Sequence, residues 1–293
     1  MQSSANLRGA IFMCLAMAGF TVNDALVKSV TGVMNPGQIM LVRGVMTSVL
    51  VLLLARHFGA FRSLRLLLDP IIALRIVAEV VAAITYISAL GEMPFANASA
   101  ILQALPLAVT SGAALFLAEP VGWRRWLAIL VGFIGVLIVL RPGPDGFSAA
   151  SIAVAASVVA AAVRDLCTRR ISPEVPSLFI SATTAVIITL TGAVLVVPLG
   201  GWQPMSMTSV LHLAAASLVL LIGYQYIVLA MRLGEIAIVA PLRYTSLIWS
   251  IGIGILFFSE KPDIWTMTGV GIIISSGLYT LARENRRRPV IAK

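Results

Sequence analysis

The side chains with the most distinctive chemistry in this sequence are ionisable residues inside long apolar runs. Glu79 lies about nine residues into its run, which is roughly 13 Å of helical rise. Arg243 lies roughly 12 Å and Arg43 roughly 10 Å from the end of their own runs by the same measure. Ionised groups are costly in hydrocarbon, so each is a functional candidate. Opposite charges at this depth suit a zwitterion, with Arg243 or Arg43 receiving its carboxylate and Glu79 or free carbonyls its ammonium.

Two pairs of opposite charges are spaced four residues apart, which places each pair on one helix face. Arg75 and Glu79 form the first pair, and a structural ion pair that fixes helix packing would explain them without any ligand. Asp24 and Lys28 form the second pair, and they either gate the end of their run or make a plain surface pair. Glu79 is also the residue best placed to carry a proton. The sequence leaves these alternatives open.

Two prolines interrupt apolar runs at sites that place polar backbone at depth. Pro106 has no N–H for the carbonyl of Leu102, and Pro241 has none for that of Ala237, so kinks are expected. A freed carbonyl survives inside a membrane only where it faces protein or a water-filled cavity. Gln103 adds a polar side chain beside the first break. We therefore expect both segments to line a pocket or to act in gating.

Several aromatic side chains with polar tips also lie within the apolar runs. Rings of this kind line cavities that accept large hydrophobic or aromatic groups, although they equally pack against neighbouring helices or lipid. The candidates for substrate contact are Tyr86, Tyr224, Tyr244 and Trp249.

The elements that carry these residues must be membrane helices. The chain is 59% hydrophobic and 11% charged, whereas a soluble domain carries roughly 25% charged residues, so lipid is its solvent. Lipid-embedded backbone must satisfy its own hydrogen bonds, and no alternating ten-residue segments indicate a barrel. We expect an all-α membrane protein with ten transmembrane helices, at about 8–28, 36–55, 70–90, 96–118, 123–140, 148–168, 177–198, 209–231, 235–258 and 264–282.

The distribution of basic residues predicts the orientation. With the N-terminus inside, fifteen of the 21 Lys and Arg residues, counted from Arg8 to Lys293, fall in inner segments. Outer segments hold only Lys28, Arg141 and Lys261. Because cytoplasmic loops are enriched in Lys and Arg, both the N- and C-termini are expected to be cytoplasmic. Topology also explains the net charge of +9, so we predict no nucleic-acid partner.

The two halves of the chain repeat each other at a fixed offset. Glu119 recurs 141 residues later as Glu260, and the same offset pairs Asp24 with Asp165. Pro120 and Trp123 recur one residue further on, as Pro262 and Trp265, and spaced glycines follow in both copies. This predicts two five-helix repeats, residues 1–145 and 146–293, the second with a short basic cytoplasmic tail. Five spans is an odd number, so the second copy must enter the membrane from the opposite side. Inverted repeats are common in secondary transporters, whose substrate site lies at the midplane between the repeats.

These features resemble the EamA-like family of the drug/metabolite transporter superfamily, over nearly the whole chain. Within it the chain looks most like the YddG-type amino-acid exporters. The resemblance implies export of small metabolites, amino acids among them, across the cell inner membrane. Other members of the superfamily carry nucleotide sugars, riboflavin, S-adenosylmethionine or drugs, and Arg43, Arg75 and Arg243 leave a nucleotide cargo open.

Other classes of function find little support in the sequence. No phosphate-binding loop of the ATPase type, no metal-ligand spacing and no nucleophile with a partner base is present, so no cofactor, metal or enzymatic activity is expected. A channel would need a continuous polar stripe, and a lipid-modifying enzyme would need clustered acids or histidines. The glycine-rich fifth and tenth spans pack together or form a dimer face, and monomer and homodimer both remain open.

Overall fold

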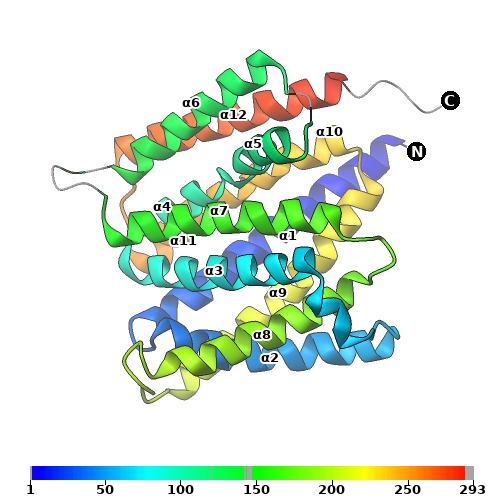
Figure 1. The fold of residues 1–293 in the computed structure, drawn as a ribbon. Helices are drawn as coiled ribbons and strands as arrows, with labels where there is room; N and C mark the ends of the chain where they lie inside the picture. The colour runs from blue at the N-terminus through cyan, green and yellow to red at the C-terminus, as the bar shows by residue number, and fades with distance from the viewer. Residues whose placement is uncertain (1, 120, 142, 144–146, 288–293) are drawn as a thin grey trace. The chain divides into compact units, whose positions relative to one another are not determined.

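The computed structural model describes residues 2–119, 121–141, 143 and 147–287, except for the side chains of 2–4, 236, 237 and 283–287. Pro120 of the repeated motif and Arg288 and Lys293 of the basic tail lie outside these residues. The described chain is all helical (Figure 1). Its elements are α1 (Gln2–Thr31), α2 (Pro36–His57), η1 (Leu64–Leu68), α3 (Pro70–Glu92), α4 (Phe95–Leu102), α5 (Leu105–Phe116), α6 (Trp123–Leu140), α7 (Ala149–Arg170), α8 (Ser177–Val196), α9 (Met207–Leu233), α10 (Ile236–Val239), η2 (Ala240–Tyr244), α11 (Thr245–Phe258) and α12 (Ile264–Arg287).

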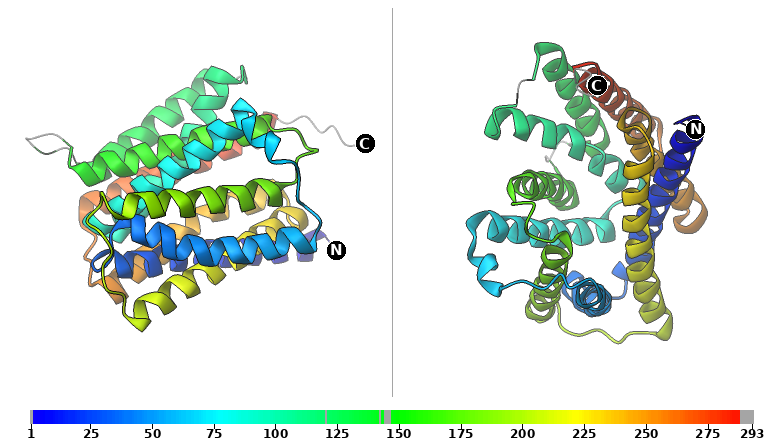
Figure 2. Two further views of the ribbon diagram at one scale, coloured as in Figure 1. Left: turned by 60° about the horizontal axis from the view of Figure 1, so that its bottom comes forward. Right: turned by 90° about the vertical axis from the view of Figure 1, so that its right-hand side faces the viewer.

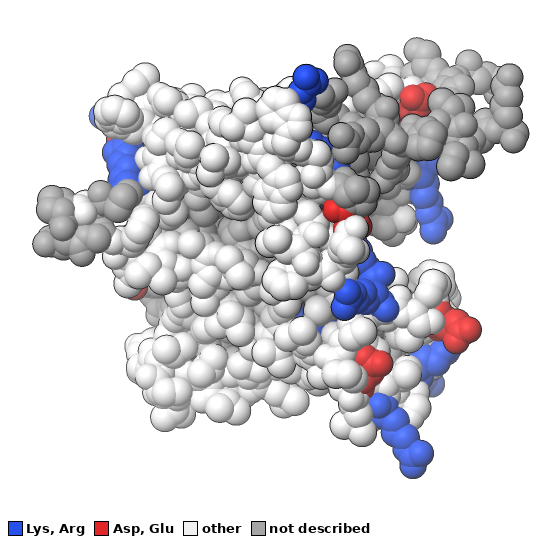
Figure 3. Space-filling model, turned by 45° about the horizontal axis from the view of Figure 1, so that its top comes forward, with Lys and Arg blue, Asp and Glu red and all other residues white. Residues whose placement is uncertain are grey.

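The prediction of ten apolar spans is confirmed within the described residues. Eight of them are single helices, whereas the fourth divides into α4 and α5 and the ninth divides into α10, η2 and α11. On the face drawn in Figure 3, charged side chains gather near the ends of helices and leave the surface between them uncharged. Lipid tails favour that pattern, because a charge at mid-depth would have no water to solvate it.

Polar caps start several of these helices. The Asn35 side chain accepts a hydrogen bond from the Gln38 N–H at 2.9 Å and so begins α2. The Asp69 carboxylate accepts from the N–H groups of Ile71 and Ile72 at 2.8 and 3.2 Å and begins α3. These side chains satisfy donors that have no partner within the helix, so the connections at the span ends can be short.

The helices form two compact units. The first unit contains residues 1–25, 94–148 and 219–293. In it α6 and α12 lie side by side, as Figure 2 also shows, and α11 packs against α4. A Cβ on Gly135 of α6 would lie 3.0 Å from the carbonyl oxygen of Gly269 on α12. The glycines therefore allow the two backbones to touch, and the glycine-rich spans pack on each other.

The second unit contains residues 26–93 and 149–218. It is built from the packed pairs α2 with α8 and α3 with α7. A Cβ on Gly192 of α8 would lie 2.6 Å from the Leu41 nitrogen of α2, so this pair too depends on a close backbone approach. Both units contain helices from each half of the sequence, so the units and the sequence repeat divide the chain differently.

Candidate functional site

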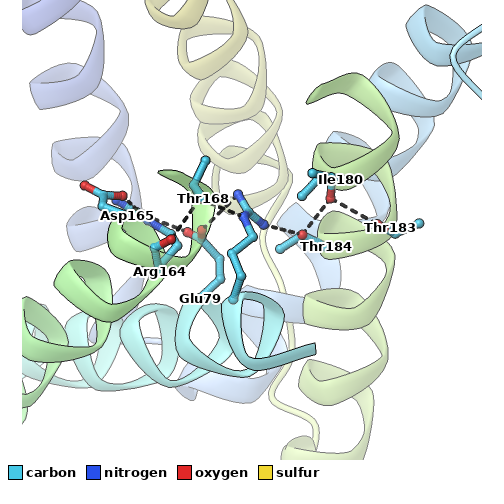
Figure 4. Close-up of polar contacts among 8 residues, drawn as sticks. Glu79, Arg164, Asp165, Thr168, Ile180, Thr183 and Thr184 are labelled. Carbon is cyan, nitrogen blue, oxygen red and sulfur yellow. Dashed lines mark hydrogen bonds and ion pairs between the residues drawn. The ribbon is translucent and has the colours of Figure 1, made fainter. Parts of the chain in front are cut away.

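A network of four charged side chains lies within the second unit (Figure 4). Glu79 of α3 receives a hydrogen bond from Arg164 of α7 at 3.0 Å and lies 3.6 Å from Arg75, four residues earlier on its own helix. Arg164 also donates to its neighbour Asp165 at 2.8 Å. The Arg75–Glu79 pair expected from the spacing is therefore present, but Glu79 lies closer to an arginine from another helix.

Threonines extend this network to a third helix. Arg75 donates to the Thr184 hydroxyl of α8 at 2.6 Å and to the Thr168 hydroxyl of α7 at 3.4 Å. Thr184 in turn donates to the carbonyl of Ile180 at 2.6 Å (Figure 4). Arg75 thus connects α3, α7 and α8, and two of its N–H groups donate to uncharged threonine hydroxyls.

The network contains as many positive as negative charges. Glu79 and Arg164 have side chains that are 22% and 23% exposed, so they are neither fully solvated nor sealed from water. Such groups exchange partners more readily than a fully buried pair, whose separation leaves an unsolvated charge. A ligand carboxylate can take the place of the Glu79 carboxylate as the partner of Arg164. A ligand ammonium can then pair with the Glu79 carboxylate, which Arg164 no longer contacts. The arrangement therefore suits a molecule that carries both charges.

The duplication does not repeat this network. The repeat offset is 141 residues, which is also the separation of the hydrogen-bonded Ser48 and Thr189. This offset aligns Glu79 with Leu220 and Arg75 with Ala216. The offset aligns Arg164–Asp165 with Asn23–Asp24 in the other unit, where Asn23 donates to Asp24 at 2.8 Å. Packing shared by both copies would not require charges in one copy alone. The asymmetry favours a specific role for the charged copy.

The first unit contains a second polar centre where the two divided spans meet. The chain breaks between α4 and α5 at Gln103 and Ala104, directly before Pro106, and the Gln103 amide donates to the Ser246 hydroxyl of α11. Pro241 lies in η2, where the ninth span changes from α-helix to 3₁₀-helix. Both prolines therefore lie where the helices are interrupted.

Tyr244 ends the 3₁₀ segment and belongs to the same centre. It is 6% exposed, and its hydroxyl finds no hydrogen-bond partner among the described residues. The hydroxyl rests against Gly277 of α12, where a Cβ would lie 1.6 Å from the oxygen. The repeat offset aligns Tyr244 with Gln103, so equivalent positions in the two halves supply polar groups here. A buried hydroxyl without a partner costs about 1–3 kcal/mol, which a hydrogen-bonding ligand would recover.

The remaining predicted site residues are dispersed. Tyr86 lies seven residues after Glu79 on α3 and hence on the same face of the helix. Arg43 lies in α2, and its carbonyl accepts from the Ser217 hydroxyl at 3.4 Å. Arg243, Tyr224 and Trp249 are exposed, and Tyr224 packs edge-on against Phe20, with ring centroids 5.2 Å apart. Arg243 directly precedes Tyr244 in η2 and so lies beside the second polar centre.

Arg164 and Asp165 are the residues that the sequence analysis missed. Arg164 was counted as an inner-segment residue, but it lies within the span Ala149–Arg170. Two signals could have identified it: it is a charge inside an apolar run, and it precedes an aspartate that aligns with Asp24 at the repeat offset. Within the described part of the chain, no group of three or more His, Cys, Asp or Glu residues could hold a metal ion.

Comparison with known proteins places this arrangement among transporters. Residues 7–141 match the EamA-like transporter family. The chain is 29% identical over 286 residues to the pseudopaline exporter CntI of Pseudomonas aeruginosa, covering 95% of this chain and 97% of that one. It is 27% identical over 286 residues to a riboflavin transporter of Vibrio cholerae, covering 96% and 95%. It is 23% identical over 284 residues to an S-adenosylmethionine uptake transporter of Rickettsia prowazekii, covering 96% and 94%.

A solved structure supports the fold independently. The crystal structure of a protein 19% identical in sequence matches this chain with a TM-score of 0.65, over 98% of this chain and 100% of the other. At that identity the likeness concerns the fold alone.

Proposed function

Because the chain belongs to the EamA-like transporter family, we propose that it moves small zwitterionic metabolites, amino acids among them, across the cell inner membrane without ATP hydrolysis. The chain is a multi-pass membrane protein that transports small metabolites, and it is not an enzyme. Its relatives include exporters and an uptake transporter, so the family does not fix the direction. Export is the direction that we propose.

The charge network in the second unit carries the proposal for the substrate class. Two arginines and two carboxylates meet inside membrane-spanning helices, with Glu79 shared between Arg75 and Arg164. An amino acid offers one carboxylate for an arginine and one ammonium for a carboxylate, so its binding keeps the site neutral. A purely anionic or cationic cargo would leave one charge of the site without compensation, which is costly in a low dielectric.

The named relatives supply a second candidate within the same chemistry. S-adenosylmethionine carries an amino-acid group with both charges in addition to its sulfonium cation, so the same network can bind the amino-acid group. Riboflavin carries neither charge and would gain nothing from exchanging ion pairs. We therefore place S-adenosylmethionine and similar amino-acid derivatives with the amino acids, and riboflavin outside the proposed class.

Competition in reconstituted liposomes tests the substrate class. Uptake of a labelled aromatic amino acid is measured while unlabelled amino acids, S-adenosylmethionine, riboflavin or a nucleotide sugar are added in turn. We expect the zwitterions to compete and riboflavin and the nucleotide sugar to have no effect. Competition by riboflavin alone would contradict the proposed class. Repeating the measurement with an imposed pH gradient tests whether protons drive the flux, and unchanged flux would exclude Glu79 as a proton carrier.

Inverted copies are a common basis of alternating access, and contacts within the units support such copies here. The offset of 141 residues separates Ser48 from Thr189, and their hydroxyls lie 3.1 Å apart. Contacts between such equivalent residues are expected along an internal two-fold axis. The helices α2 and α8, which contain them, occupy the same position in their respective halves.

Within the first unit, a reciprocal pair of contacts between α6 and α12 gives separate support for inverted copies. Ser276 donates to the Ala128 carbonyl at 2.6 Å. At the repeat offset, Ser276 is equivalent to Gly135 and Ala128 is equivalent to Gly269. These two glycines are also in contact, because a Cβ on Gly135 would lie 3.0 Å from the Gly269 oxygen. We infer two inverted repeats, 1–145 and 146–293, with both termini cytoplasmic.

Single cysteines at Phe61 and Trp202, equivalent positions in the two halves, test the orientation in a chain without native cysteines. An impermeant maleimide added to intact cells should label the cysteine at 202 and spare that at 61. Labelling of both positions from one side would contradict an inverted repeat.

A further inference from the structure

The connection between α2 and α3 carries apolar and basic side chains in close alternation at one end of the second unit. Phe58, Phe61, Leu64 and Leu68 are 67%, 50%, 70% and 82% exposed, and the arginines between them are exposed as well. Apolar side chains exposed next to cations are typical of segments that lie at a membrane surface. We name this set the basic rim, consisting of Phe58, Phe61, Arg62, Leu64, Arg65 and Leu68.

Local hydrogen bonds fix the basic rim in place. Gly59 adopts φ +60°, which ends α2, and the Ala60 N–H donates to the Ala55 carbonyl at 2.8 Å. The Ser63 hydroxyl then accepts from the Arg65 N–H at 3.3 Å and begins η1. The backbone bonds are thus satisfied within the segment, and its large apolar side chains are left on the outside.

The charge of the two rim arginines is not compensated within the described part of the chain, where Arg62 donates to the neutral carbonyls of Gly59 and Phe61 at 3.3 and 2.9 Å. Within the part of the chain that the structure describes, no carboxylate makes an ion pair with Arg62 or Arg65. The nearest acid in sequence, Asp69, accepts from the first N–H groups of α3. Arg56 in the last turn of α2 adds a further exposed cation. The rim therefore offers positive charge to a partner outside the chain.

The equivalent segment of the second half keeps the apolar part of the rim. The repeat offset aligns Phe61 with Trp202 and Leu64 with Met205. Trp202 is 54% exposed, and it follows Gly201, whose carbonyl accepts from Asn35 at the start of α2 at 2.6 Å. The two segments thus adjoin opposite ends of one helix, and both expose large apolar side chains.

The charge of the rim is not kept in the equivalent segment. The same offset aligns Arg62 with Gln203 and Arg65 with Ser206, and residues 199–206 contain no charged side chain. Membrane contact accounts for the apolar residues in both segments, and the arginines occur in the segment expected on the cytoplasmic side, where the leaflet is anionic. We propose that the basic rim binds the anionic headgroups of phospholipids in the adjoining leaflet, with the phenylalanines and leucines inserted between the chains.

Electrostatics at a membrane surface give the size of the effect. Each Lys or Arg near an anionic leaflet contributes on the order of 1 kcal/mol, so two arginines correspond to a preference of about 30-fold for anionic over zwitterionic lipid. The attraction is screened within a Debye length of about 8 Å at physiological salt, so the preference falls as salt is raised. The apolar anchors contribute equally in either lipid and set no preference.

The test measures lipid proximity directly and does not depend on transport. The full chain, with Cys14 and Cys167 replaced by alanine, carries a fluorophore on a single cysteine at Leu64 or, as the matched control, at Met205. It is placed in mixed vesicles of phosphatidylcholine and phosphatidylglycerol, in which only one of the two lipids is brominated and quenches. We expect brominated phosphatidylglycerol to quench the label at 64 more strongly, and both lipids to quench the label at 205 equally.

Two double variants separate charge from folding. Arg62→Gln with Arg65→Ser copies the equivalent segment at these two positions and should remove most of the preference at 64, leaving the part that Arg56 contributes, while quenching itself persists. Arg62→Lys with Arg65→Lys keeps the charge and should retain most of the preference. Equal quenching by the two lipids in the parent chain, or an unchanged preference in the Gln/Ser variant, would overturn the proposal. So would loss of the preference on adding inorganic phosphate at constant ionic strength, since that would identify a site for free phosphate.

Discussion

Replacing Glu79 with glutamine removes one charge from the network and keeps the shape of the side chain. The ion pair with Arg164 at 3.0 Å and that with Arg75 at 3.6 Å are both lost. Arg164 keeps Asp165 at 2.8 Å, and Arg75 keeps Thr184 at 2.6 Å. Because every arginine retains an acceptor, we expect the chain to fold and to insert into the membrane.

The cost to stability lies between two known limits. Breaking a buried ion pair by removing one partner costs about 3–5 kcal/mol, and an exposed pair is worth about 0–1 kcal/mol. Glu79 and Arg164 are 22% and 23% exposed, so we expect Glu79→Gln to lower the free energy of unfolding by about 1–2 kcal/mol. A hydrogen bond to a charged group is worth about 1.5–3 kcal/mol, so losing the contact with a substrate ammonium should raise KM by about 10- to 150-fold.

A double variant distinguishes a structural ion pair from a substrate contact. Glu79→Gln combined with Arg75→Gln leaves Arg164 paired with Asp165, so no charge of the network loses its partner and stability should recover in either case. A structural pair predicts that transport recovers as well. Substrate contact predicts that KM stays high while the unfolding midpoint returns toward that of the parent chain. Uptake into liposomes and thermal unfolding in detergent measure the two quantities.

The matched control neutralises an ion pair outside the spans. Arg141 pairs with Asp263 between the ends of α6 and α12, and Arg141→Gln should leave KM unchanged. A Glu79→Gln variant with normal stability and unaltered KM would refute the reasoning, and so would full recovery of transport in the double variant.

Three further changes test the supporting structure. Glu260→Gln weakens the acceptor of the two N–H groups that begin α4, at 2.6 and 3.2 Å, and should lower stability by about 1 kcal/mol in thermal unfolding. Gly277→Ala forces a Cβ against the Tyr244 hydroxyl and should cost about 1–3 kcal/mol, whereas Tyr244→Phe removes a buried hydroxyl that has no partner among the described residues and should not destabilise the chain. The hydrogen bond from Arg141 holds the pKa of Asp263 well below its ordinary value, so Asp263→Asn should lower the unfolding midpoint at neutral pH, and the difference should shrink as pH falls below about 4.

Each of these has a control or a contrary outcome. Glu92→Gln removes an exposed carboxylate near the start of α4 and should leave stability unchanged. Gly271→Ala adds a methyl group where no atom lies within 4 Å, so it should be tolerated. Equal effects of the alanine changes at 271 and 277 would contradict the packing described for α12. A pH-independent effect of Asp263→Asn would contradict the role of its ionised form, whose stabilisation is present above the ordinary pKa and lost in acid.

The large elements of the fold could be predicted from the sequence because membrane spans depend on length and apolar composition, which are local properties. Pro106 and Pro241 also identified the interrupted helices, since a missing N–H acts within one turn. The partner of Glu79 could not be identified in this way. Arg75 was visible at a spacing of four residues, but Arg164 reaches Glu79 only through the packing of α7 on α3, 85 residues away in sequence.

Exposure at the protein surface was likewise not predictable from position within a span. Arg243 and Trp249 lie well inside the ninth run, yet both are exposed at the surface. Glu260 was recognised only as part of the repeated motif. Its hydrogen bonds to α4 follow from packing between the two halves of the sequence, which composition does not encode.

The central claim is that this chain transports zwitterions through the network around Glu79, and counterflow tests it most directly. Liposomes that contain the purified chain are loaded with an unlabelled amino acid and diluted into trace labelled amino acid, with no ATP and no ion gradient. We predict transient accumulation of the label in these liposomes and strongly reduced accumulation with Glu79→Gln. The same accumulation in liposomes without protein, or in those with Glu79→Gln, would contradict the claim.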